Sequence, residues 1–301
     1  MTSQPVIVPL HSSTAHAGIP NLRRSYSDTR NLWSVVLTTL LWGLAGLAAI
    51  PLFSVLYMLI SQGGARLGLD LFTQLPPAGF MRGGGFGNAV VGTLVMVLIA
   101  SLISIPIGVI AGIFLGAIAP NSRGAAAARF STQVLTGFPS ILAGVFVFGI
   151  LVQPMGTYSA IAGGVAIAVL MLPTVILTAE QAIRMVPQRM KDAAIGMGCT
   201  PTQTVAKVVL PTALPGIMTG IMLAVAGGMG QAAPLLFTSL FSNFWLQSLT
   251  EPTASLSILI FNFSGMPFAN QTQLAWSASL VLVLIVLVFN ILSRVVSLKR
   301  R

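Results

Sequence analysis

Residues 88–119 read NAVVGTLVMVLIASLISIPIGVIAGIFLGAIA and contain no charged side chain. A helix needs roughly 20 apolar residues to cross a ~30 Å hydrocarbon core, so this stretch is long enough to cross a membrane with some tilt. Five further apolar stretches are also long enough, at residues 33–60, 131–152, 158–179, 214–237 and 274–296. The sequence therefore predicts an all-α, polytopic integral membrane protein with six transmembrane helices.

The composition supports this prediction and suggests an orientation. Of 301 residues, 55% are apolar and only 7% are charged, whereas soluble domains average about 25% charged residues. Among the fifteen basic residues, only Arg66 and Arg82 lie in the loops of one side, and the others lie in the terminal segments and the opposite loops. The positive-inside rule then predicts that both termini are cytoplasmic. It also accounts for the net charge of +10 without a nucleic-acid partner.

The chain divides into a short polar segment and one long apolar domain. Residues 1–30 are rich in Ser, Thr, Pro and Asn, and we expect them to form a cytoplasmic N-terminal tail. The next apolar stretch is longer than the core of a secretory signal, so we expect an uncleaved anchor. Residues 31–301 are expected to form a single transmembrane domain. The single cysteine, Cys199, excludes a disulfide within the chain.

Several kinds of chemistry are missing from the apolar domain. Both histidines, His11 and His16, lie in the tail, and no G-x-x-x-x-G-K-[ST] phosphate-binding loop is present. The five acidic residues fall at span ends or in loops, at Asp28, Asp70, Glu180, Asp192 and Glu251. We therefore expect no catalytic site, no metal site and no cofactor on this chain. Such a protein is either a self-contained channel or the conduit of a transporter that another subunit powers.

The loop after the fourth apolar stretch has strong helix signals. Pro187 and Gly198 bracket a short segment with proline near the first helical position and glycine just past the end. Thr200 and Gln203 then form a Thr-x-x-Gln capping box, which predicts a second short helix ending near Val209. We expect re-entry into the membrane at Pro211 and Pro215. A partner subunit can grip such a helix-turn-helix, although an amphipathic linker on the lipid headgroups has a similar pattern.

Residues of this loop resemble the E-A-A-x-x-x-G-x9-I-x-L-P motif of ABC importer permeases. The matching residues are Asp192, Ala193, Ala194, Gly198, Val208, Leu210 and Pro211. Asp192 replaces Glu and keeps its carboxylate, and Val208 replaces Ile. The resemblance implies a MetI-like permease bundle. It also implies a coupling loop at about residues 180–211 that docks on an ATP-hydrolysing subunit.

Segments between residues 84 and 238 resemble, more narrowly, the PstA-type permeases of phosphate-specific transporters. These segments are GGFGNAVVGT (84–93), GFPSILAG (137–144), MLP (171–173), TAE (178–180), ALPGI (213–217) and APLL (233–236). The resemblance implies a non-catalytic subunit in the bacterial inner membrane. Its implied partners are a second, PstC-like permease, two PstB-like subunits that bind ATP and Mg, an external PstS-like phosphate-binding protein, and membrane lipid.

Three positions depart from the PstA-type pattern. Leu177 and Gly227 stand where that family has arginines, and Gln231 stands where it has a glutamate. An arginine inside a span costs ~2.5 to 3.5 kcal/mol on insertion scales, so a family that keeps one there uses it to attract an anion. In this chain, the charge that attracts phosphate has to come from the companion permease. Otherwise backbone N–H groups and hydroxyls have to hold the anion.

Five polar residues are candidates for the substrate pathway: Asn88, Thr93, Ser140, Thr174 and Gln231. A flexible glycine-rich junction explains the sequence before Asn88 as well as a pathway does. Prolines next to Ser140 and Thr174 are also ordinary in membrane helices. Gly108, Gly112 and Gly116 form a strip on which another helix can pack. Glu180 is expected to pair with Arg184, one turn later.

We therefore interpret the sequence as half of the translocation pathway of an ATP-driven importer, with phosphate as its expected cargo. Two alternatives stay open, which are a permease for another oxyanion such as sulfate or molybdate, and a self-contained channel.

Overall fold

A computed structural model describes residues 29–298 of the chain. Most of the tail predicted for residues 1–30 lies outside this range, including His11, His16, Arg23 and Arg24. The division into a tail and a transmembrane domain therefore stays a prediction. Lys299, Arg300 and Arg301 also lie outside the described residues; they are among the basic residues on which the predicted orientation depends.

The chain forms two compact units, which meet between Val55 and Leu56. The described part of the first unit is helix α1 (Thr29–Met58), whose last residues already belong to the second unit. Its side chains from Leu32 onward are almost all exposed in the isolated chain, including Trp33 and Trp42. A helix with apolar residues on every side is expected to be surrounded by lipid or by other apolar helices.

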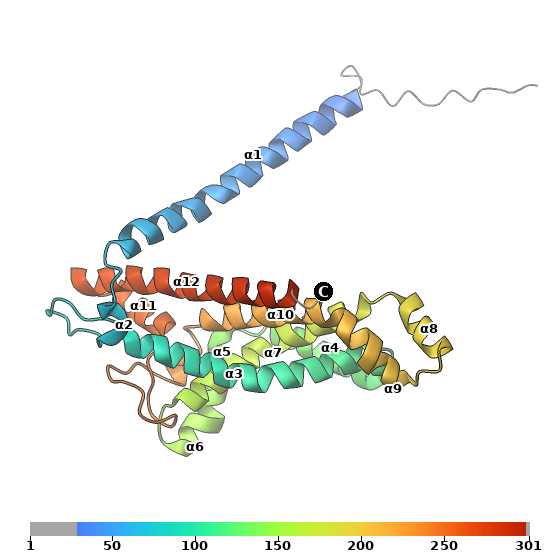
Figure 1. Ribbon diagram of the computed structural model, residues 1–301. Helices are drawn as coiled ribbons and strands as arrows, with labels where there is room; N and C mark the ends of the chain where they lie inside the picture. Colours follow the sequence, from blue (N-terminus) through green and yellow to red (C-terminus); the bar gives the residue numbers. More distant parts are fainter. Residues whose placement is uncertain (1–28, 299–301) are drawn as a thin grey trace, which may run out of the picture. The chain divides into compact units, whose positions relative to one another are not determined.

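The second unit is a helical bundle (Figure 1). Its longer helices are α3 (Gly87–Ile113), α4 (Arg123–Thr136), α7 (Ala160–Arg184), α10 (Leu210–Met229) and α12 (Ala269–Leu298). Its shorter α-helices are α2 (Asp70–Thr73), α5 (Ser140–Val147), α6 (Gln153–Met155), α8 (Gln188–Gly196), α9 (Pro201–Thr204) and α11 (Leu256–Ser264). Its remaining helical segments are η1 (Leu59–Gly63), η2 (Phe114–Ile118), η3 (Phe148–Val152), η4 (Val205–Val209) and η5 (Leu235–Phe237). Within residues 29–298, five helices are long and apolar enough to cross a membrane, or six if one bent pair is counted.

Helix α7 is the centre of the bundle, because α3, α10, α4 and α5 all pack against it. The predicted glycine strip on α3 is one of the reasons. A Cβ atom at Gly112 would lie 2.5 Å from Cβ of Ala179, and one at Gly108 would lie 2.7 Å from Val175. Only glycine allows the two backbones to approach this closely, as in other membrane helix pairs. The strip therefore serves packing within the chain.

The third predicted span, residues 131–152, differs from a straight helix. Helix α4 ends at Thr136, and the pair formed by Arg123–Thr136 and Ser140–Met155 is bent by 105°. Pro139 explains the break, because proline has no N–H to continue a helix and restricts the residue before it. The apolar count extends across this corner, which is why the sequence alone predicted one span.

Helix α10 also differs from the prediction at both ends. We expected a short helix to stop near Val209, but η4 joins α9 to α10 and the helical stretch runs from Pro201 to Met229. The π-helical η4 accommodates Pro211, since the N–H of Leu210 donates to the Val205 carbonyl instead of the usual i−4 partner. At the other end, the helix stops at Met229 and not at Phe237, because Gly227, Gly228 and Gly230 favour helix poorly.

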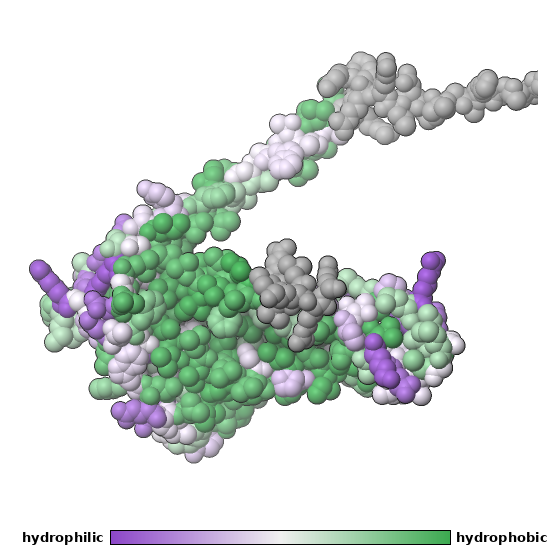
Figure 2. Space-filling view, viewed as in Figure 1, coloured by the Kyte–Doolittle hydropathy of each residue, from purple (hydrophilic) through white to green (hydrophobic). Residues whose placement is uncertain are grey.

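The surface of the second unit is divided by polarity. Figure 2 shows hydrophilic residues gathered at its two ends, with an apolar band between them. At the end where α3 begins, Asn270 Nδ2 donates to the carbonyls of Met81 (2.8 Å) and Gly83 (3.3 Å), and Arg66 binds the carbonyl of Gly84. Burial lowers the pKa of Arg66 below its ordinary value. The opposite end carries α8 (Figure 1).

Candidate coupling and translocation sites

The predicted coupling loop is a short helix between two long ones. Helix α8 follows the end of α7 after only three residues, and Pro187 precedes its first residue, as the sequence indicated. Gly198 lies beyond its end with a φ of +91°. That left-handed conformation is natural for glycine and unfavourable for other residues. The loop therefore reverses direction at Gly198, and α9 begins three residues later.

The start of α9 is capped as predicted. The N–H of Gln203 donates to the Thr200 hydroxyl (3.3 Å), and the N–H of Thr200 donates to the Gln203 side-chain oxygen (3.0 Å). Pro201 occupies the first helical position, where its missing N–H costs nothing. Both turns of the loop thus follow from local sequence signals.

The motif residues lie on both sides of this turn. Ala194 is the one buried residue of α8, whereas Asp192, Ala193 and Gly198 are exposed. Leu210 and Pro211 open α10, and Pro211 is exposed. The large exposed apolar side chains of the loop are Met185, Met190, Ile195 and Met197. Exposed apolar residues beside charged ones, on a helix that stands out from the bundle, are typical of a surface that another protein covers.

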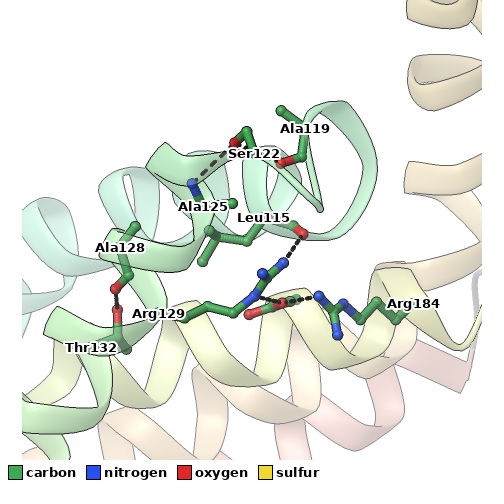
Figure 3. Close-up of polar contacts among 9 residues, drawn as sticks. Leu115, Ala119, Ser122, Ala125, Ala128, Arg129, Thr132 and Arg184 are labelled. Atoms are coloured by element: carbon green, nitrogen blue, oxygen red, sulfur yellow. Dashed lines mark hydrogen bonds and ion pairs between the residues drawn. The ribbon is translucent and has the colours of Figure 1, made fainter.

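A cluster of charges lies at the base of this loop, at the end of α7 (Figure 3). Glu180 is buried, and its Oε1 accepts from Arg184 one turn later (2.8 Å), as predicted. The same oxygen also accepts from Nε of Arg129 on α4 (2.7 Å), a contact that was not predicted. Nη2 of Arg129 donates in addition to the carbonyl of Leu115 (2.8 Å). One buried carboxylate therefore holds two guanidinium groups.

Two of the five pathway candidates meet in one cavity. Thr174 of α7 and Gln231, just after α10, both line a cavity of about 280 Å³. The remaining lining residues are apolar or glycine: Leu170, Met171, Leu223, Ala224, Gly227 and Gly228. Within the described residues, neither the Thr174 hydroxyl nor the Gln231 amide makes a hydrogen bond. The cavity thus offers two uncharged polar groups with free hydrogen-bonding capacity.

Gly227 is the lining residue at which the family pattern has an arginine. A Cβ atom there would have nothing within 4 Å, so the position has open space in front of it. Leu177, the other departure from an arginine, lies on α7 outside the cavity and is half-buried. Gly227 and Gln231, which both line the cavity, thus stand where the family pattern has an arginine and a glutamate, and no charged side chain lines the cavity.

The other three candidates lie elsewhere. Asn88 Nδ2 donates to the carbonyls of Ser242 (2.9 Å) and Phe244 (3.3 Å), and the Thr93 hydroxyl accepts from the N–H of Leu256 (2.9 Å). Both side chains are buried; Asn88 holds the segment 242–244 against α3, and Thr93 holds the start of α11 (Leu256–Ser264) there. Ser140 is half-buried at the start of α5. None of the three lines the cavity of Thr174 and Gln231.

The glycines before Asn88 have a packing role. A Cβ atom at Gly85 would lie 2.6 Å from the carbonyl oxygens of Asp70 and Leu71. The N–H of Gly85 donates to the Leu75 carbonyl (3.0 Å), and that of Gly87 donates to the Gln74 carbonyl (3.3 Å). These backbone groups have partners within the chain, so the close approach of two segments explains the glycines.

Comparison with known proteins agrees with the helical architecture. The family model for the binding-protein-dependent transport system inner membrane component matches residues 104–301. Among solved structures, the MetNI methionine ABC transporter in an inward-facing conformation aligns with a TM-score of 0.54 at 20% identity, over 71% of this chain and 93% of that one. A bacterial alginate ABC transporter aligns with a TM-score of 0.57 at 14% identity, over 87% and 92%. At these identities the likeness shows the fold, which is the expected MetI-like bundle.

Sequence relatives are more specific. The phosphate transport system permease protein PstA of Yersinia pestis is 37% identical over 93% of this chain and 94% of its own length. The probable PstA of the archaeon Methanocaldococcus jannaschii is 37% identical over 80% and 85%, and PstA 1 of Mycobacterium tuberculosis is 30% identical over 94% and 95%. The chain belongs to the family of binding-protein-dependent inner-membrane transport components and, within it, to the PstA-type permeases.

Proposed function

We propose that this chain is one permease subunit of an ATP-driven importer of inorganic phosphate and forms half of its translocation pathway. This chain matches relatives along almost their whole length, and those relatives are named phosphate transport system permease proteins, which supports phosphate as the cargo. The observation that carries the proposal is the coupling loop. The motif residues lie on an exposed short helix at one end of an apolar bundle, with Gly198 in the conformation that the turn requires.

The partners follow from this role. The chain has no phosphate-binding loop of its own, so ATP and Mg²⁺ belong to two PstB-like subunits that dock on α8. A PstC-like permease supplies the other half of the pathway, and a PstS-like protein delivers phosphate from outside. The thirteen basic residues of one side support an orientation with both termini and α8 in the cytoplasm.

Helix α8 is linked along the chain to both helices that line the cavity. Helix α8 lies between α7, which carries Thr174, and the continuous stretch from α9 to α10, which ends just before Gln231. When ATP binding closes the ATPase pair, displacement of α8 shifts α7 and α10 relative to the partner permease. The bundle thereby changes between outward-open and inward-open states, as in other rigid-body transitions.

The cavity is the proposed place where phosphate passes this chain. The hydroxyl of Thr174 and the amide of Gln231 are suited to hydrogen-bond an oxyanion, and the walls around them are apolar. No charged side chain lines the cavity, so neutralisation of the anion falls to the companion permease. Asn88, Thr93 and Ser140 are weaker candidates, because they lie outside the cavity and two of them already hold other segments in place.

Reconstitution tests the function and its alternatives. We expect proteoliposomes that contain this chain, the PstC-like permease and the PstB-like subunits to accumulate labelled phosphate only when ATP and the external binding protein are present. Liposomes that contain this chain alone should show no phosphate flux. A matched preparation with labelled sulfate or molybdate serves as the specificity control.

Each outcome separates the hypotheses. ATP-independent flux through the chain alone would identify a channel. Uptake of sulfate or molybdate in preference to phosphate would identify a permease for another oxyanion.

A further inference from the structure

Arg129 satisfies a backbone carbonyl that the sequence leaves without a partner. In η2 the N–H of Ala119 donates to the Phe114 carbonyl, so it does not bond the carbonyl of Leu115. The residue after Ala119 is Pro120, which has no N–H to offer. Leu115 is buried, and an unpaired buried carbonyl is costly. The guanidinium of Arg129 fills this vacancy at 2.8 Å.

The same guanidinium also connects its own helix, α4, to α7. It projects from the face of α4 that also carries the buried residues Ala125 and Thr132, and its Nε binds Oε1 of Glu180 at 2.7 Å. Arg129 therefore connects η2, which continues α3, with α4 and the end of α7 (Figure 3). The planar guanidinium has several donors in fixed directions, which allows a single side chain to bridge three elements.

The second arginine of the cluster, Arg184, lies on the same helix as Glu180. It binds the same oxygen of Glu180 from four residues along and is half exposed. Each arginine thus carries one positive charge, and both bind the same carboxylate. Of these two arginines, only Arg129 binds Glu180 from a different helix. This difference separates the electrostatic role of the cluster from its mechanical role.

The cluster lies at the base of the coupling helix. Only Met185, Val186 and Pro187 separate Arg184 from α8. Helix α8 packs on α9 and η4, and this short link also transmits a push on α8 to the end of α7, close to the point where Arg129 holds it. If that end yielded by itself, the motion would be lost in the last turn of α7 and would not reach the cavity.

We propose that Arg129 is a positioning residue for energy coupling, which clamps η2 and the end of α7 to α4 so that a push on α8 moves them as one body. The proposal rests on the proposed function, since it requires a complex that couples ATP hydrolysis to uptake. It adds to the motif of the coupling loop a contact that lies outside it and that holds its base in place.

The test compares two substitutions in the complete reconstituted transporter. R129Q and R184Q each remove one positive charge and each leave Glu180 with one arginine, so both proteins are expected to assemble. For R129Q we expect the ATP hydrolysed per phosphate imported to rise at least about fivefold, the lower end of typical coupling between sites. For R184Q we expect a change within about twofold, because Arg184 is half exposed and connects Glu180 to no other helix, while Arg129 still neutralises the buried carboxylate.

A third variant covers a failure of R129Q to assemble. In R129K the charge remains, but one ammonium group replaces the two nitrogens that bind Glu180 and Leu115, and we expect partial uncoupling. The proposal is overturned if R129Q or, in its place, R129K keeps the wild-type ratio, or if R184Q is as uncoupled as R129Q. If the wild-type complex itself does not couple ATP to phosphate uptake, the proposed function fails instead.

Discussion

Two parts of α7, less than two turns apart, treat polar groups in opposite ways. At Glu180 a buried carboxylate is held by two arginines. At Thr174 the helix faces a cavity whose lining contains no charged residue. Each element of the charged part is fixed by a partner, whereas the Thr174 hydroxyl and the Gln231 amide make no hydrogen bond within the described residues. Along α7, the buried charge is thus part of a fixed ion-pair cluster, whereas the Thr174 hydroxyl faces the cavity without a partner in the described part of the chain.

This contrast has a physical basis. A buried charge is tolerated in an apolar environment only when partners neutralise it, and removal of one partner is strongly unfavourable. A permanent ion pair also has no free capacity to bind a passing ion. Uncharged hydroxyl and amide groups bind an anion more weakly and release it more easily, which suits a pathway. The end of α7 is therefore suited to transmit force, and its middle is suited to transient binding.

The largest effect is expected in the coupling loop, at Gly198. A β-branched residue is rarely found at a φ of +91°, so Gly198→Val should shift the turn and misplace α8. We expect phosphate uptake to fall by at least about tenfold, the effect of ~1.4 kcal/mol, while the protein remains in the membrane. Uptake in proteoliposomes and the amount of protein in the membrane check this.

Gly196→Val is the matched control for Gly198. Gly196 lies on the same exposed loop, and a Cβ atom at either glycine would have nothing within 4 Å, but only Gly198 has a positive φ. We expect near-normal uptake for the control. Equal losses in both variants would mean that the loop is sensitive to added bulk. The positive φ of Gly198 would then not be the reason for its effect.

The next largest effect is expected in the cavity. Thr174→Val and Gln231→Leu keep most of the side-chain volume and remove the polar groups. A hydrogen bond to a charged group contributes ~1.5 to 3 kcal/mol, so we expect each variant to lower phosphate uptake by roughly tenfold or more. The measurement is the initial rate of uptake at several phosphate concentrations.

Thr219→Val is the control for the cavity. Thr219 also lies on α10, but its hydroxyl already donates to the Pro215 carbonyl (2.9 Å) and it lies outside the cavity. Its uptake should resemble that of the wild type. Normal uptake by both cavity variants would contradict the assignment of the pathway to this cavity. It would not contradict the assignment of the coupling loop.

The sequence predicted those features of these sites that depend on neighbouring residues. The turn at Gly198, the capping box at Thr200 and the pair of Glu180 with Arg184 all involve residues at most four positions apart, and all were confirmed. The pair of Arg129 with Glu180 was missed, because 51 residues separate them and no local pattern connects them.

Backbone changes of direction were harder to predict than helices. The 105° bend before Ser140 and the continuation of the helix through Pro211 both depend on how one proline is accommodated. Proline ends a helix in one case, and in the other a π-helical turn absorbs it. Thr174 and Gln231 were named separately as candidates, and only the packing of α7 against α10 brings them into one cavity.

The smallest effect is expected at the cap of α9. Thr200→Ala removes the side-chain oxygen that accepts from Gln203, at a cost of ~1 kcal/mol to the local helix. Since α9 continues through η4 into α10, most of the helix is held by packing elsewhere, and we expect uptake to fall by less than about fivefold. Thr200→Ser, which keeps the hydroxyl, should behave like the wild type. A loss as large as that of Gly198→Val would show that coupling depends on the start of α9, against which α8 packs, as strongly as on the turn at Gly198.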